Sequence, residues 1–129
     1  MDDLHLPPTS LTPEVAWIPR QGLLTMRGES YPENVLSFYA PILERMSSVL
    51  ESGSLTMLNV EMHITYYNSA SAKAFHRIFH MLNQAAEKGC AIKLHWNYDE
   101  EDDMARDLGK DIHEDFPAIH FVDCPLAAA

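Results

Sequence analysis

The sequence predicts a single α/β domain built on a mixed sheet, with an N-terminal hairpin and helices packed on the sheet. Apolar segments with strand character alternate with amphipathic helical segments along the chain. The apolar fraction of 47% is typical of a globular protein. The length of 129 residues fits one domain, expected over residues 12–124 between a flexible arm at 1–11 and a tail at 125–129.

The first elements after the arm are two strands, EVAWIP and GLLTMRG, and their connection PRQG predicts a hairpin. The turn SYPEN follows, and Asn34 can cap the helix expected at residues 35–51. Pro41 must kink or restart that helix, because proline lacks an N–H and crowds the preceding turn. The apolar face of this helix is predicted to be Val35, Phe38, Tyr39, Ile42, Met46 and Val49.

The second half of the chain alternates strand and helix. LTMLNVEMHITYY is apolar enough for a central strand, and it leads into the clearest helix, residues 69–88, which Gly89 ends. The strand CAIKLHWNY, an acidic helix over residues 99–116 and the strand AIHFVDC complete the pattern. Because strands joined by helices need crossover connections, a mainly parallel central sheet is expected. The predicted apolar faces are Phe75, Ile78, Phe79, Leu82 and Ala86 in the first helix, and Met104, Leu108 and Ile112 in the second.

The chain is strongly acidic, and the charge is unevenly distributed. The net charge is −10, and the residues from Asp99 onward contribute −8 of it. Such a surface repels phosphates, which argues against nucleic acid or an anionic membrane as a partner. The N-terminus lacks a signal-peptide pattern and no apolar run approaches the ~20 residues of a membrane span, so a cytoplasmic location is expected.

His76 and His80 are spaced four residues apart on the helix at residues 69–88. Two imidazoles at this spacing could bind one metal ion, as in a small metal-dependent hydrolase. Both lie opposite the predicted apolar face, however, and no HExxH motif accompanies them. A solvent-facing pair is therefore expected, with no metal site and no cofactor.

Five consecutive acids stand near the start of the last predicted helix: Asp99, Glu100, Glu101, Asp102 and Asp103. They lack the alternating acids and the glycine of a calcium loop. Acids at a helix start complement the positive end of the macrodipole. The run is therefore interpreted either as helix-terminal charge alone or as a charged docking surface as well.

The junction YYNSASAK, residues 66–73, joins the central strand to the clearest helix. Asn68 has the chemistry of an N-cap, and Ser69 then falls in the first turn over the positive end of the helix. That field would favour a phosphate on Ser69. In a crossover fold the junction also lies at the sheet edge where α/β proteins place their sites. Helix capping is the simpler interpretation, and a modification site is the alternative.

Three segments, GESYPENVLSFYAPIL, YYNSASAK and LHWNYDEEDDM, occur in an order and spacing that resemble the SiaC family of bacterial regulatory phosphoproteins. These are distant relatives of anti-sigma-factor antagonists with a STAS-like fold, and the resemblance covers about residues 5–122. It implies a partner-switching protein without enzymatic activity. In the family, a dedicated Ser/Thr kinase phosphorylates the hydroxyl residue after the Asn, and a PP2C-type phosphatase removes the phosphate. The unmodified form binds and stimulates a diguanylate cyclase, which raises cyclic di-GMP and promotes aggregation or biofilm formation.

By position, the resemblance implies phosphorylation of Ser69, with Ser71 as the alternative and Asn68 as the helix cap. The family pattern reads Asn-Thr-Ser-Ser, whereas this chain reads Asn-Ser-Ala-Ser; Ser69 keeps the acceptor oxygen and Ala70 removes one competitor. A plain anti-sigma-factor antagonist, which acts on transcription, is the alternative function. The expected partner-binding surface comprises Tyr67, Asn68, Ser69, Ser71, Lys73, Asp99, Glu100, Glu101, Asp102 and Asp103.

Overall fold

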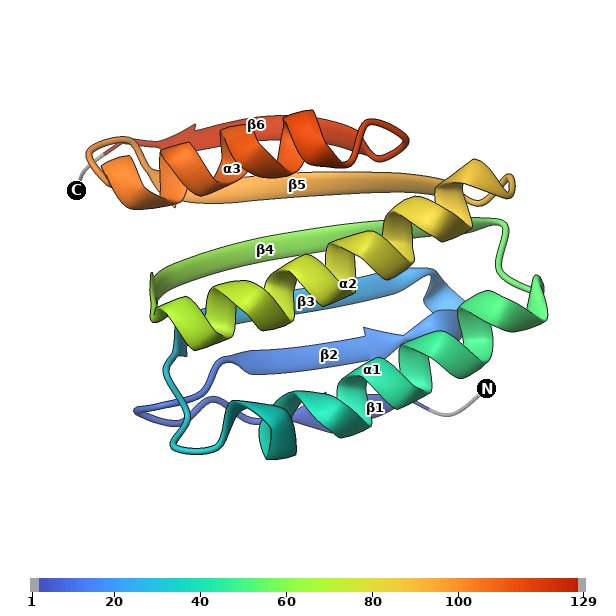
Figure 1. Ribbon diagram of the computed structural model, residues 1–129, viewed down its shortest axis with the longest axis horizontal. Coiled ribbons are helices and arrows are strands. Elements are labelled where there is room, and N and C mark those ends of the chain that lie inside the picture. The colour runs from blue at the N-terminus through green and yellow to red at the C-terminus, as the bar shows by residue number, and fades with distance from the viewer. Residues whose placement is uncertain (1–2, 128–129) are drawn as a thin grey trace.

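A six-stranded mixed sheet is the central layer of the protein, which is described here by a computed structural model of residues 3–127 (Figure 1). The strands lie side by side in the order of the sequence, β1-β2-β3-β4-β5-β6. Their bounds are β1 Leu4–Leu6, β2 Glu14–Ile18, β3 Leu23–Ser30, β4 Met57–Tyr67, β5 Ala91–Asp99 and β6 His120–Leu126. The α-helices are α1 Val35–Ser52, α2 Ser69–Glu87 and α3 Asp103–Asp115. The predicted single α/β domain with a mixed sheet is confirmed.

The N-terminal part of the sheet is antiparallel. β2 and β3 form the predicted hairpin, in which Trp17 pairs with Leu24, and a short 3-10 helix, Pro19–Gln21, connects them. The loose arm expected at residues 1–11 is wrong for Leu4–Leu6, which pair with β2 as strand β1. Three residues are too short for a recognisable alternation, and this strand exists because Leu4 and Leu6 pack against the core. Residues 1–2 of the expected arm lie outside the described residues.

The other half of the sheet is parallel, as predicted, and β3, β4, β5 and β6 follow one another with a helix between each pair. All three helices cover the same face of the sheet (Figure 1). Each crossover between parallel strands has the same hand, and each leads to the next strand in the same direction across the sheet. Every connecting helix is therefore placed on the same face. The core lies between the helices and the sheet, and its largest fully buried side chains include Trp17, Tyr39, Phe75, Phe79 and Trp96.

The opposite face of the sheet carries polar side chains along β4 and β5. Side chains alternate along β5, so that Leu94 and Trp96 enter the core while Lys93, His95 and Asn97 point to this second face. The His95 Nδ1 lies 3.1 Å from Glu61 Oε1, and the amide of Asn97 donates to Glu61 Oε2 at 3.2 Å. This face therefore carries paired polar groups where the other face carries the core.

The helix caps follow the prediction. Asn34 Oδ1 accepts the Ser37 N–H at 3.0 Å, and α1 continues through Pro41 without restarting. Pro41 has no N–H to donate to the carbonyl of Ser37, four residues earlier. Both residues are exposed, so water can bond to that carbonyl instead. At the end of α2, Gly89 has the left-handed φ of 108° expected there.

The acidic segment departs from the predicted helix in its start and its phase. Asp99 ends β5, residues 100–101 form a turn, and Asp102 caps α3 by accepting the Ala105 N–H at 3.1 Å. Met104, predicted to be buried, is 60% exposed, and Ala105 takes its place in the core. The packing of α3 fixes this phase, because a Cβ on Gly109 would lie 2.7 Å from the Trp96 ring.

The C-terminal tail expected at residues 125–129 is shorter than predicted. Pro125 and Leu126 belong to β6, where they pair with Tyr98 and Asp99. A proline is tolerated here because β6 is an edge strand with one free side. Residues 128–129 of the expected tail lie outside the described residues.

Candidate functional site

The predicted helix start at the YYNSASAK junction is confirmed. Asn68 has an extended backbone, and its Oδ1 accepts the Ser71 N–H at 2.9 Å. α2 begins at Ser69, whose side chain is exposed. The junction directly follows β4, at the edge where the parallel strands end and the helices begin, on the left of Figure 1. Ser69 is thus a solvent-accessible hydroxyl at the positive end of a long helix.

Ser71 is fully buried, although it lies only two residues after Ser69. Its Oγ accepts a hydrogen bond from the Ser30 hydroxyl at 2.8 Å, and the Ser30 hydroxyl also bonds the Tyr39 hydroxyl at 2.6 Å. These three hydroxyls tie the end of β3 to α1 and to the first turn of α2. The inclusion of Ser71 in the partner-binding surface is therefore wrong, and its hydroxyl is not accessible to a kinase in the folded protein.

The buried hydroxyl chain gives the protein a measurable response to alkaline pH. Burial raises the pKa of Tyr39 from 10.0 to about 12, although the hydrogen bond with Ser30 opposes the shift. The folded protein therefore holds this proton more tightly than the unfolded chain does. We expect the contribution of Tyr39 to stability to be intact below about pH 10 and to be lost progressively between about pH 10 and pH 12.

The comparison of wild type with Tyr39→Phe tests this expectation, because the variant has no proton to lose at this position. Urea unfolding at pH 9 and pH 11.5 should show a loss of stability larger by about 2 kcal/mol in wild type than in the variant. The remaining tyrosines titrate in both proteins, so the difference isolates Tyr39. Equal losses in the two proteins would show that Tyr39 is not the buried, proton-retaining residue.

Large apolar side chains are exposed at the same edge of the sheet as Ser69. Four of the five large hydrophobic residues that are exposed among residues 3–127 lie at this edge, and Met57 lies at the opposite end of β4. They belong to four different elements: the starts of α1 and α3 and the ends of β4 and β6. We call this surface the Ser69 edge, and it comprises Ser69, Leu36, Tyr66, Met104 and Leu126.

The structure places the acidic segment next to the junction, as the predicted surface requires. The Tyr67 hydroxyl donates to the Met104 carbonyl at 3.2 Å and so joins the end of β4 to the start of α3. Burial, followed by the negative charge of Asp102 and of two acids further along α3, raises the pKa of Tyr67. Asp102 is used as the helix cap and Asp103 pairs with Arg106 at 2.9 Å, whereas Glu100 and Glu101 are exposed. Lys73 is exposed one turn along α2 from Ser69.

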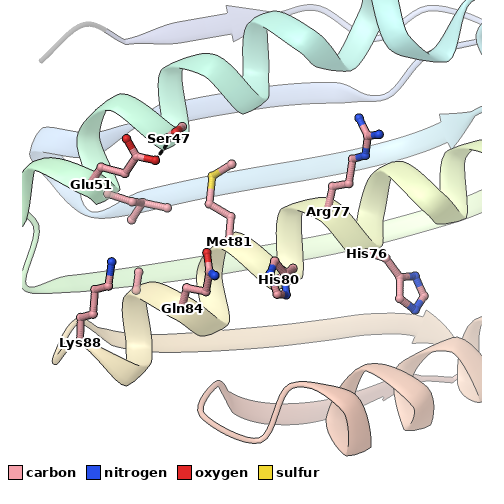
Figure 2. A pocket seen from close by; sticks show the side chains of 10 residues that line it. Ser47, Glu51, His76, Arg77, His80, Met81, Gln84 and Lys88 are labelled. Atoms are coloured by element: carbon pink, nitrogen blue, oxygen red, sulfur yellow. Dashed lines mark hydrogen bonds between the residues drawn. The ribbon is translucent and has the colours of Figure 1, made fainter.

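The histidine pair does not form the solvent-facing unit that was predicted. His80 is exposed, as expected, but His76 is half-buried. The His76 Nδ1 lies 3.0 Å from the Ala72 carbonyl oxygen, and its ring packs against Phe116 with the ring centres 5.9 Å apart. Figure 2 shows His76 extending toward α3. Among residues 3–127, no three His, Cys, Asp or Glu side chains are grouped so that they could hold a metal ion.

Sequence reasoning missed the apolar part of the Ser69 edge. Leu36 is 66% exposed. Its position outside the apolar face of α1 could have been found from the helical periodicity of the sequence. Tyr66 and Leu126 carry no such signal, because both stand at strand ends. The burial of Ser30 was also missed, because the two hydroxyls that it contacts, those of Tyr39 and Ser71, belong to other elements of the fold.

The comparison with known proteins decides the family. A family model described as SiaC family regulatory phosphoprotein matches residues 6–126. The chain belongs to the SiaC family. An uncharacterised protein of Pseudomonas aeruginosa strain UCBPP-PA14 is 31% identical over 115 residues, which cover 89% of this chain and 90% of that protein.

Solved structures of the SiaC family share the fold throughout. The crystal structure of apo-SiaC from Pseudomonas aeruginosa superposes with a TM-score of 0.88 at 30% identity, over 96% of this chain and 99% of that one. A chain in the crystal structure of the diguanylate cyclase SiaD in complex with its activator SiaC, also from Pseudomonas aeruginosa, gives a TM-score of 0.84 at 29% identity. The match covers 98% of this chain and 100% of that chain. Among the described residues of this SiaC-family chain, no helix has the length and apolar character needed to cross a bilayer.

Proposed function

We propose that this chain is a non-enzymatic partner-switching regulator. Its unmodified form binds and activates a diguanylate cyclase, and phosphorylation of Ser69 releases that partner. The observation that carries the proposal is the exposed Ser69 hydroxyl at the start of α2, at the edge of the sheet where four large apolar side chains are also exposed. The complex of SiaD with its activator SiaC, whose fold this chain shares, supports a diguanylate cyclase as the partner.

The start of α2 suits a reversible phosphate. A phosphate adds a charge of about −1.5 to −2 at pH 7, and a helix N-terminus favours that charge because its first N–H groups lack helical partners. A Ser/Thr kinase and a PP2C-type phosphatase both need a hydroxyl that they can reach. Ser69 meets this condition, whereas Ser71 would need local unfolding of α2.

The proposed docking surface consists of the junction and the acidic segment: Tyr67, Asn68, Ser69, Lys73, Asp99, Glu100, Glu101, Asp102 and Asp103. Its acids favour a partner surface with basic residues at the rim and act more on the association rate than on the affinity. Because the kinase consumes ATP and the cyclase consumes GTP, the cytoplasm is the proposed location.

The test is cyclic di-GMP synthesis by a diguanylate cyclase from the same organism. The unphosphorylated chain is expected to raise the rate of synthesis, and the chain pretreated with its kinase and ATP should not. Pretreated Ser69→Ala should still stimulate the cyclase. The matched control is Ser37→Ala, which removes an exposed hydroxyl from the first turn of α1 and should behave as wild type.

Two results would contradict the proposal. If the unmodified chain leaves cyclase activity unchanged, the partner is not this enzyme. Capture of an anti-sigma factor by the unmodified chain would then assign the protein to transcription control. If pretreated Ser69→Ala loses its effect together with wild type, the modified residue is not Ser69.

A further inference from the structure

Ser30, at the buried end of β3, holds the Asn68–Ser71 turn at both of its ends. The Asn68 N–H donates to the Ser30 carbonyl oxygen at 3.3 Å, and the Ser30 hydroxyl donates to Ser71 Oγ at 2.8 Å. Asn68 and Ser71 are also joined to each other by the helix cap, in which Asn68 Oδ1 accepts the Ser71 N–H at 2.9 Å. The three residues form a closed ring of hydrogen bonds, and the backbone of Ser69 and Ala70 lies between the two held ends.

This ring depends on a change of register between β3 and β4 just before the junction. Gly28 pairs with Ile64. Ser30, two residues later, pairs with Tyr67, which comes three residues after Ile64. A slip of one residue reverses the face to which the following side chains point, so the irregularity decides which residues of the junction meet Ser30. Gly28 suits the irregular backbone, because its φ of 120° lies in the region that favours glycine.

The hydrogen-bond pattern gives the Ser30 hydroxyl a single task toward the turn. Its one proton is donated to Ser71 Oγ, so the Tyr39 hydroxyl, 2.6 Å away, must be the donor to Ser30 Oγ. Ser30 and Ser71 have no exposed surface. Without the Ser30 hydroxyl, Ser71 Oγ would stay buried without its donor, and opening of the first turn of α2 would return that oxygen to water. Tyr39 contacts Ser30 but contributes no bond to the ring.

We propose that Ser30 is a positioning residue for the modification of this protein: it presents Ser69 to the kinase and withholds Ser71. The ring fixes the backbone on both sides of Ser69, and one bond of that ring keeps the Ser71 hydroxyl buried. The inference rests on the proposed function, because it concerns how the kinase meets its acceptor.

Phosphoryl transfer makes the position of the acceptor matter. The bond from Ser69 Oγ to the γ-phosphorus of ATP forms while the bond from that phosphorus to ADP breaks, and the hydroxyl proton passes to a base of the kinase. The attacking and leaving oxygens must lie roughly in line, and a displacement of about 1 Å can slow such a step about a hundredfold. A loosened turn should therefore lower kcat more than it raises KM.

Hydrogen exchange of the full chain is the first test, and it needs no partner. In Ser30→Ala, the Ser71 and Ala72 amides should exchange at least tenfold faster than in wild type, because both are bonded within the turn. This increase should exceed the one at Phe79, whose amide reports opening in the middle of α2. Tyr39→Phe is the matched control, since it removes a hydroxyl from the same buried chain and leaves the ring intact. It should leave the exchange of Ser71 close to that of wild type.

The second test is phosphorylation by the Ser/Thr kinase of the same organism with ATP, with each phosphate located by mass spectrometry. Wild type and Tyr39→Phe should carry phosphate on Ser69 alone. Ser30→Ala should show at least tenfold lower kcat at Ser69 with KM changed by less than twofold, and it should also gain phosphate on Ser71. Ser71→Ala removes the same hydrogen bond from its other end, so it should lower kcat at Ser69 by a similar factor. Adding Ser30→Ala to Ser71→Ala should change kcat no further.

The outcomes separate the inference from the proposed function. Modification of Ser30→Ala on Ser69 alone, with the kcat of wild type, would overturn the inference and leave the proposed function standing. Equal changes in Ser30→Ala and Tyr39→Phe would also overturn it, because both would then reflect lost stability. A wild-type chain that gains no phosphate on Ser69 would overturn the proposed function and, with it, the role of the ring. If Ser30→Ala does not fold, kcat of Ser71→Ala at Ser69 decides: a tenfold loss supports the inference, and the wild-type value overturns it.

Discussion

Replacing Phe79 with alanine is expected to lower the free energy of unfolding by about 3–5 kcal/mol. The Phe79 side chain has no exposed surface, and it connects three elements. Its ring centre lies 6.4 Å from that of Trp96 on β5 and 6.0 Å from that of Phe116 at the end of α3. Truncation leaves a cavity that these rings cannot fill without moving the backbone, so the loss of apolar burial and the cavity both destabilise the fold. Urea denaturation at neutral pH measures the change.

The neighbouring residue provides the control. His80 follows Phe79 on the same helix but is exposed, so His80→Ala should change the free energy of unfolding by no more than about 0.5 kcal/mol. Both variants introduce alanine into the middle of α2, which equalises the effect of helix propensity. A large loss for His80→Ala, or a small one for Phe79→Ala, would mean that the buried face of α2 has been assigned wrongly.

Phosphorylation of Ser69 is expected to weaken partner binding about a hundredfold, which corresponds to about 2.7 kcal/mol. In the free protein the start of α2 stabilises the phosphate, since a negative charge at an exposed helix N-terminus gains about 0.3–1 kcal/mol. In the complex, the partner surface removes water from the same dianion. If no Arg or Lys of the partner replaces that water, the desolvation cost falls on the complex alone.

Kinase-treated and untreated chain should therefore differ in affinity and not in stability. Calorimetric titration against the cyclase gives the dissociation constants, and the thermal midpoint gives the stability of each form. Kinase-treated Ser69→Ala should bind as untreated wild type does. Ser69→Asp should lie in between, because a carboxylate has one charge and fewer acceptor oxygens than a phosphate. Equal affinities would exclude a phosphate switch at Ser69, and a collapsed midpoint would show that the phosphate acts by unfolding the domain.

Much of the fold follows from local interactions that the sequence displays. The cap of α2 needs only Asn68 and the N–H of Ser71, three residues away, so it was predictable from the junction itself. The buried face of α2 follows from helical periodicity, and Phe75, Ile78, Phe79 and Leu82 are all buried as predicted. The hairpin and the parallel central strands follow from the order of strands, turns and helices.

The wrong predictions share one physical cause. Contacts between residues far apart in the sequence decide which of several locally equivalent residues is buried. Local chemistry permits either Ser69 or Ser71 as an exposed hydroxyl, and the contact of Ser71 with Ser30, 41 residues earlier, buries one of them. Met104 and Ala105 could each begin the buried face of α3, and the close approach of Gly109 to Trp96 selects Ala105. Strand β1 forms only because β2 is present to pair with it.

The sequence by itself determined the α/β class and the start of α2, because these depend on periodicity and on side chains within one helical turn. Only the tertiary structure decided that Ser71 is buried while Ser69 is exposed, and that four exposed apolar side chains share the edge of the sheet with Ser69. The residues of the Ser69 edge come from five elements spread between Leu36 and Leu126, and no local pattern relates them. They lie at one edge of the sheet because the strands β3 to β6 are parallel, which places the ends of these four strands and the starts of the three α-helices there.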